Sequence, residues 1–261
     1  MRKFSLLSTC VLLSTALFLF SSCSDDDDSG KGETGKKMVP SKLVMEDWEI
    51  SYEYDSQYRV IKETHKEGNE TYLLTFEYDG EGRLQKEIKD SYTTTYTYNK
   101  DTVFVKEGEY SVDTLIINDK NQIVKSLNYG LTTFQYNADG TLASSESESS
   151  SSDGNYKSST TNKYTYDKKK GAFADVNILS WQTFRILEDV MVGHISNITQ
   201  EEWTYNKQNP DEETTDSGKY VISYSYNKDG YPTEGKAIAY DENGKIEEGS
   251  GSISIDYIEK K

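Results

Sequence analysis

Large apolar residues recur along this chain in a four-residue pattern: a large apolar residue, any residue, a second large apolar residue, then Asp or Asn. Successive side chains of a strand point to opposite faces, so the first and third positions share one face. The Asp or Asn then opens a turn, because its side chain accepts hydrogen bonds from the following backbone amides. Nine copies of the pattern begin at Tyr52, Phe76, Tyr96, Leu115, Phe134, Tyr164, Trp203, Tyr224 and Ile238.

Each copy predicts one β-hairpin, and several turns carry the Gly that such loops favour, as in Asp79-Gly80-Glu81-Gly82. Nine hairpins predict an all-β antiparallel meander of about 16–18 strands over residues 41–261. A rolled sheet and a closed, porin-like barrel both satisfy this pattern. We expect the paired aromatic rings to form the core; the alternative is an exposed platform for sugars or peptides.

Two stretches interrupt the repeat. Ser144–Asn162 is rich in Ser, Thr and Glu, which predicts either a long solvated hairpin tip or an extended polar strand pair. Phe173–Ile198 is the most apolar part of the chain after the N-terminus. Its apolar residues fall near a helical period, so we expect a short helix or irregular segment near residues 174–191, capping the barrel or sheet end. An apolar lid over a ligand is the alternative.

The N-terminal residues have the features of an export signal. Arg2 and Lys3 precede an apolar stretch that ends in small residues before Cys23, which is typical of a secretory signal over residues 1–22. The run from Leu19 to Cys23 resembles a bacterial lipobox, which implies acylation of Cys23. Ordinary cleavage near Ser22, leaving a free thiol, is the alternative.

The acidic run that follows, Ser24, Asp25, Asp26, Asp27 and Asp28, resembles the export tag that carries lipoproteins of Bacteroidetes to the cell surface. The alternatives are a solvated, self-repelling tether or a weak site for a hard cation. Residues 23–40 are expected to form a flexible acidic and Gly-rich tether.

Net charge and aromatic content argue against two classes of protein, nucleic-acid binders and disordered chains. The formal net charge is -16, which repels phosphate backbones and argues against nucleic-acid binding. Aromatic residues make up 12% of the chain, a share that disordered chains lack. The 21 Tyr far outnumber the 8 Phe, so many rings bring a hydroxyl into the predicted strands.

Catalytic chemistry finds little support. The only histidines, His65 and His194, lie in different repeats and are expected at the surface. We therefore predict no catalytic residues, no metal site, no cofactor and no enzymatic activity. Asp101-Thr102-Val103 and Asp113-Thr114-Leu115 match short O-glycosylation sites, so Thr102 and Thr114 are candidates for modification, with chance matching as the alternative.

The pattern Tyr-x-Tyr-Asp-x-x-Gly-x-Leu resembles the YD repeats of Rhs-type shells. Together with the acidic lipoprotein leader and the segment Tyr166–Asn177, it is similar to a Bacteroidetes family of surface lipoproteins of unknown function with a porin-like fold. This resemblance implies the fold and an envelope location, and no chemistry. Strands with charged residues at mid-height do not favour insertion into the bilayer.

We therefore expect a protein held at the outer membrane by its N-terminal lipid and facing outward. It would serve as a non-catalytic binding or envelope-structural module, with an unidentified glycan or protein ligand. A glycan-binding or glycan-processing accessory lipoprotein is the alternative, and a hydrolase is the least favoured.

Overall fold

The computed structural model describes residues 36–128, 130–186, 192–210, 212–247 and 251–261, and these form a closed antiparallel barrel of sixteen strands. The first eight strands are β1 Met38–Met45, β2 Trp48–Tyr54, β3 Val60–Glu67, β4 Glu70–Tyr78, β5 Leu84–Lys89, β6 Tyr92–Asn99, β7 Thr102–Glu107 and β8 Tyr110–Ile117. The others are β9 Ile123–Ser126, β10 Leu131–Tyr136, β11 Leu142–Ser150, β12 Lys157–Tyr166, β13 Ile198–Asn209, β14 Glu212–Tyr226, β15 Pro232–Asp241 and β16 Gly251–Glu259.

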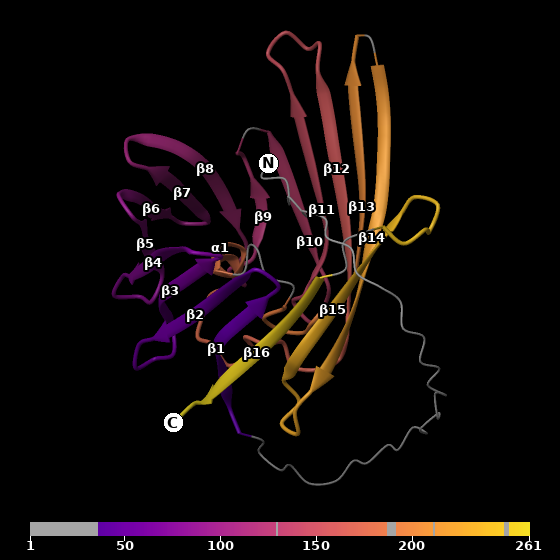
Figure 1. Ribbon diagram of the computed structural model, residues 1–261. Coiled ribbons are helices and arrows are strands. Elements are labelled where there is room, and N and C mark those ends of the chain that lie inside the picture. Colours follow the sequence, from indigo (N-terminus) through magenta and orange to yellow (C-terminus); the bar gives the residue numbers. More distant parts are fainter. Residues whose placement is uncertain (1–35, 129, 187–191, 211, 248–250) are drawn as a thin grey trace.

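Each strand pairs with its neighbours in sequence, and pairing of β1 with β16, for example Leu43 with Ile255, closes the ring. The predicted all-β meander is thus confirmed, and the barrel is closed rather than an open roll (Figure 1). β1 begins at Met38, so the barrel includes the last residues of the segment expected to be tether.

Seven of the nine pattern copies end an even-numbered strand at one rim, which we call the lower rim. Two copies depart from the expected hairpin. Asn206 lies within β13 and pairs with Thr215, so it opens no turn. Asp241 ends β15 and opens a turn at the opposite, upper rim. The copy at Trp203 follows the long insertion between β12 and β13, and the copy at Ile238 follows its predecessor after one strand instead of two. Neither copy therefore ends at the lower rim, although each keeps its local alternation.

The turns at the lower rim are built as the pattern predicts. Asp79 Oδ1 accepts hydrogen bonds from the backbone amides of Glu81 and Arg83, both 2.9 Å long. Gly82 takes a φ of +79°, a conformation that other residues adopt only with strain. The guanidinium of Arg83 pairs with Asp79 and lies 4.3 Å from the ring centre of Tyr98, so this turn also contacts the next hairpin.

The motif rings face into the barrel. Tyr96 is 3% exposed, whereas the intervening Thr97 is exposed on the outer face. The structure therefore places these aromatics in the core, as expected. A recurrent hydrogen bond gives the many Tyr hydroxyls a role, because each ring hydroxyl donates to a backbone carbonyl of the preceding strand. The pairs are Tyr54 with Pro40, Tyr78 with Val60, Tyr98 with Leu84, Tyr136 with Ile123, Tyr224 with Ile198 and Tyr257 with Pro232.

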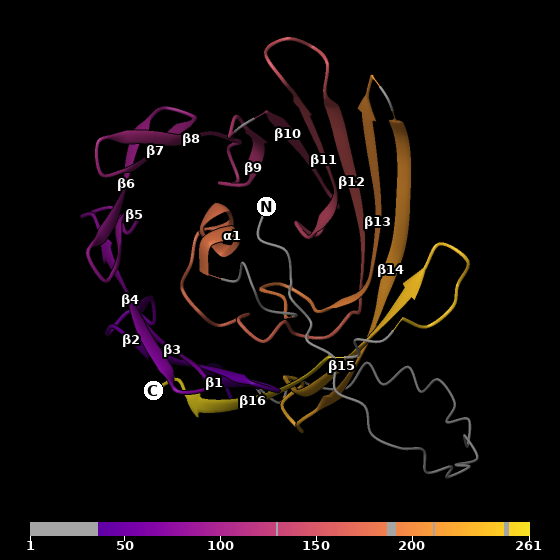
Figure 2. The same cartoon turned by 45° about the horizontal axis from the view of Figure 1, so that its top comes forward.

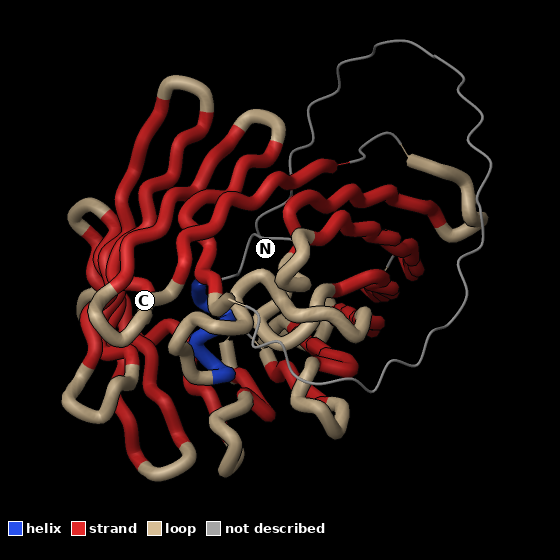
Figure 3. The backbone as a smooth tube through the Cα atoms, turned by 90° about the horizontal axis from the view of Figure 1, so that it is seen from below, coloured by secondary structure: helices blue, strands red, loops and turns tan. Residues whose placement is uncertain are grey.

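The chain between β12 and β13 enters the barrel from the lower rim. Its described parts, residues 167–186 and 192–197, form what we call the plug segment, with a 3₁₀ turn η1 (Ser180–Gln182) and a short helix α1 (Thr183–Ile186). Figure 2 shows α1 inside the ring of strands, and Figure 3 shows it from below, surrounded by strands. The expected helix near 174–191 therefore exists in its described part, but it fills the lumen instead of capping an end.

Aromatic contacts hold the plug segment in place. Trp181 is fully buried, with its ring centre 5.5 Å from that of Tyr96. Phe173 meets Tyr52 edge-on at 5.3 Å. The plug segment supplies the apolar surface that these inward rings need, because a barrel of sixteen strands is too wide for wall side chains alone to fill.

The upper rim is uneven. β11–β14 rise well above the other strands (Figure 1), and β14 alone has 15 residues. Ser144–Asn162 supplies most of β11 and β12, so the extended polar strand pair is the correct one of the two interpretations.

The outer face of β2–β5 carries charged pairs close to the lower rim, one residue pair from the turns. Glu53 pairs with Lys62 at 2.7 Å and Glu77 with Lys86 at 2.8 Å, each across adjacent strands. The apolar band of a lipid-facing barrel is about 25 Å tall and would cover nearly the whole length of these short strands, the charged pairs included. The outer face of β2–β5 is therefore suited to water.

Candidate binding site in the barrel lumen

A cavity of about 750 Å³ separates the plug segment from the wall formed by β6–β13. Its wall side includes Thr94, Val112 and Phe134, and its plug side includes Phe184 and His194. The lining also reaches Glu107 and Asn128, which are exposed residues at the upper rim. The cavity therefore extends from the plug segment toward the upper opening.

Two titratable groups of the cavity are biased toward their neutral forms. Burial raises the pKa of Glu201, and a hydrogen bond with Tyr164 opposes this only in part. Burial lowers the pKa of His194, although a hydrogen bond to the backbone of Val176 acts in the opposite sense. The surroundings of both groups disfavour their charged forms, which suits an uncharged guest.

Asp113 is held in a network on the cavity wall. Its carboxylate accepts hydrogen bonds from the Ser126 hydroxyl at 2.8 Å and from the backbone amide of Leu127 at 3.1 Å. The cavity thus combines apolar rings with a few fixed polar groups, and its volume lies in the range of small-molecule sites.

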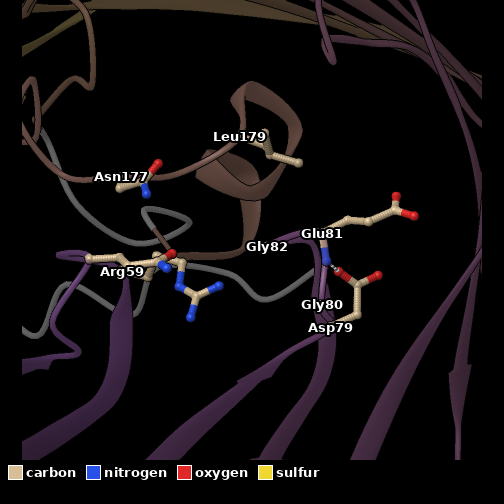
Figure 4. Close-up of a pocket in the computed structure, with 8 residues that line it drawn as sticks. Arg59, Asp79, Gly80, Glu81, Gly82, Asn177 and Leu179 are labelled. Atoms are coloured by element: carbon tan, nitrogen blue, oxygen red, sulfur yellow. Dashed lines mark hydrogen bonds between the residues drawn. The ribbon is translucent and has the colours of Figure 1, made fainter.

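A second concavity, of about 440 Å³, lies at the lower rim between two turns and the plug segment (Figure 4). Arg59, Asp79, Glu81, Asn177 and Leu179 lie around it. Two of its charged groups already form ion pairs within the turns, Arg59 with Asp55 and Asp79 with Arg83. The lumen cavity is therefore the better candidate site.

A buried polar network escaped the sequence interpretation. His65 Nε2 lies 2.8 Å from a carboxylate oxygen of Glu63, and His65 Nδ1 lies 3.1 Å from the hydroxyl of Tyr72. Glu63 is only 3% exposed, and the ring of Trp48 stacks parallel to His65. The spacing Glu-x-His in a strand was the available signal, because it places both residues on the inner face.

Both histidines were expected at the surface, and this was wrong. His65 lies on the inner face of β3, and His194 lines the cavity from the plug segment. Strand alternation and the return of the plug segment into the lumen bury them. They lie in separate environments, and within the described residues no three His, Cys, Asp or Glu side chains gather as a metal site.

The remaining sequence candidates have different outcomes. Cys23 and the run Ser24–Asp28 lie outside the described residues. Thr102 and Thr114 lie on the neighbouring strands β7 and β8, where they pair with Ile116 and Phe104. Both threonines are on the outer face, because Val103 and Val105 point inward and are buried. No described helix is long and apolar enough to cross a membrane.

No protein-family model matches the sequence, and no curated protein matches it either. Among solved structures, the chain is similar to a porin-like protein from Bacteroides vulgatus ATCC 8482, with a TM-score of 0.44 and 14% identity over 85% of this chain and 99% of that one. It is also similar to a porin-like protein from Bacteroides uniformis ATCC 8492, with a TM-score of 0.38 and 16% identity over 84% and 98% of the two chains.

A third similarity is to a chain of the TcdB2-TccC3-Cdc42 complex, with a TM-score of 0.29 and 15% identity. It covers 84% of this chain and 12% of that one. The closed barrel of the structure agrees with the porin-like fold that the resemblance implied. The lipoprotein leader and the relation to YD repeats stay predictions.

Proposed function

We propose that this protein is a lipid-anchored, non-catalytic binding barrel of the outer cell surface, which holds a small uncharged ligand in its lumen. The observation that carries the proposal is the cavity of about 750 Å³ between the plug segment and the wall. Its mixed lining and its extension to Glu107 and Asn128 at the upper rim are what a ligand entering from that side requires.

The predicted anchor fits the same orientation. β1 begins at the lower rim, so a lipid on Cys23 would attach the barrel by that end. About fifteen residues lie between Cys23 and Met38, and they span at most about 50 Å when extended. The upper rim and the cavity mouth would then face the medium, and the charged outer face of β2–β5 would stay in water.

A neutral fluorescent probe, N-phenyl-1-naphthylamine, tests the lumen as a binding site. The chain without its predicted signal, residues 23–261 and called the mature chain below, should bind it saturably. Thr94→Trp should weaken binding at least tenfold, because Thr94 lines the cavity and the larger ring would occupy part of it.

Thr95→Trp is the matched control, because Thr95 lies on the outer face of the same strand and pairs with Lys86 and Lys106. Equal binding by the two variants, with both folded by thermal melting, would show that the probe binds elsewhere. The absence of saturable binding to the mature chain would contradict a lumen site.

A further inference from the structure

The inner face of β11–β14 continues upward from the cavity as a wall of hydroxyl and amide groups. Ser145, Asn162, Trp203 and Gly218 lie side by side across four strands, and Ser147, Thr160, Tyr205 and Asp216 form the next row above. Glu201, which lines the cavity, lies on the same face of β13 one row below Trp203. The wall is thus continuous with the candidate site.

Trp203 is the flat apolar element of this wall. A Cβ atom added at Gly218 would lie 2.9 Å from Cζ2 and 3.1 Å from Cε2 of the Trp203 ring. The indole therefore packs closely against Gly218, which has no side chain to exclude it. The side chain of Trp203 as a whole is only half-buried, so part of its ring remains accessible.

Polar groups with remaining hydrogen-bonding capacity surround the ring. Asn162 Nδ2 donates to Ser145 Oγ at 3.2 Å, and the Asn162 amide oxygen is a further acceptor. In the upper row the hydroxyls of Tyr205 and Tyr156 lie 3.1 Å apart, and each retains further capacity. Successive rows lie about 7 Å apart, two residues along a strand.

We propose that this inner wall binds a neutral oligosaccharide, with one sugar ring on the indole of Trp203 and its hydroxyls bonded to Asn162 and Tyr205. Stacking on a flat ring beside donors and acceptors suits a ligand with an apolar face and a polar edge. This inference rests on the proposed lumen function and names its ligand class.

Charge favours a neutral sugar over an acidic one. Asp216 stands in the upper row of the wall, within a chain of net charge -16. Lys207 follows above, but its ammonium lies 3.7 Å from the carboxylate of Glu212. A uronic or sulfated sugar would meet repulsion here.

An array of neutral and acidic oligosaccharides, probed with the mature chain, tests the ligand class. The strongest neutral binder is then titrated calorimetrically against the mature chain and its variants. We expect Trp203→Ala to weaken binding at least tenfold and Trp203→Phe to retain most of it. Asn162→Ala should weaken binding several-fold.

Asn206→Ala is the matched control, because Asn206 lies in the next row of the same strand pair with its side chain on the outer face, where it bonds Ser159 and Thr215. Thermal melts establish that each variant is folded. Neutral binding that is insensitive to Trp203→Ala and Asn162→Ala would overturn the assigned site.

Binding of acidic glycans alone would overturn the ligand class. If no glycan binds while N-phenyl-1-naphthylamine binds the lumen, the saccharide inference fails and the lumen function stands. If neither binds, both fail.

Discussion

The hydroxyl of Tyr98 donates a 2.6 Å hydrogen bond to the carbonyl oxygen of Leu84, the first residue of the neighbouring strand. Leu84 is fully buried, so removing the donor leaves a carbonyl without water to replace it. Tyr98→Phe should therefore lower the free energy of unfolding by about 1–3 kcal/mol.

Tyr98→Ala also removes the ring that packs on Trp181, and we expect a loss of roughly 3–5 kcal/mol. Thr97→Ala, on the exposed outer face, should cost far less. Urea denaturation of the three variants measures all of these values. A near-native stability for Tyr98→Ala would argue against the core role of the motif aromatics.

Trp181 tests whether the plug segment is part of the folded core. Its ring is fully buried and packs against the rings of Tyr96 and Tyr98. Trp181→Ala should lower the free energy of unfolding by about 3–5 kcal/mol. Lys169→Ala, at an exposed position of the same segment, is the control and should leave the melting temperature unchanged. Equal melts for the two variants would mean that the plug segment contributes little to stability.

Glu201 should make stability depend on pH. Burial raises its folded-state pKa above the ordinary value of 4.5, so the unfolded chain loses this proton at lower pH than the folded chain does. The protonation of Glu201 therefore contributes to the free energy of unfolding in full below pH 4.5, and this contribution is lost as the pH rises through the raised pKa.

Glu201→Gln should therefore stabilise the barrel at neutral pH, and the gain should shrink as the pH falls toward 4.5. Urea denaturation at several pH values measures the difference. A gain that does not change with pH would exclude this titration as its cause.

The predicted leader gives a test in cells. Cys23→Ser should abolish membrane attachment, because stable anchoring needs the multiple acyl chains of a lipoprotein. Replacing Asp25, Asp26, Asp27 and Asp28 with Ala should leave attachment intact and remove exposure at the cell surface. Protease treatment of intact cells reports exposure. Equal cleavage of the tetra-Ala variant and the wild type would contradict the export-tag interpretation.

Local rules predicted most of this fold. Alternation placed Tyr96 and Tyr98 on one face, and Asp79 with Gly82 fixed a turn, because both signals act within a few residues. Barrel closure follows from the pairing of Leu43 with Ile255, whose long separation in sequence leaves no local trace. The position of the plug segment also depends on contacts between residues far apart in sequence. Its helical period predicts α1 but not the placement of α1 inside the lumen.

The candidate site was harder to predict for the same reason. Trp203 and Gly218 come together only through the register of β13 with β14, and Ser145 joins them through two further strand pairs. The pattern copy at Trp203 predicted a turn at Asn206, so it pointed away from the wall. Glu201 is one of 45 acidic residues, and only its burial distinguishes it.

Protection of an introduced thiol tests the lumen site most directly. Thr94→Cys and Thr95→Cys, each in residues 23–261 with Cys23→Ser, place a single thiol on the cavity side or on the outer side of the same strand. A small maleimide should label both. Saturating N-phenyl-1-naphthylamine should slow labelling at position 94 at least tenfold and leave position 95 unchanged, whereas equal rates with and without the probe at position 94 would contradict a ligand in the lumen.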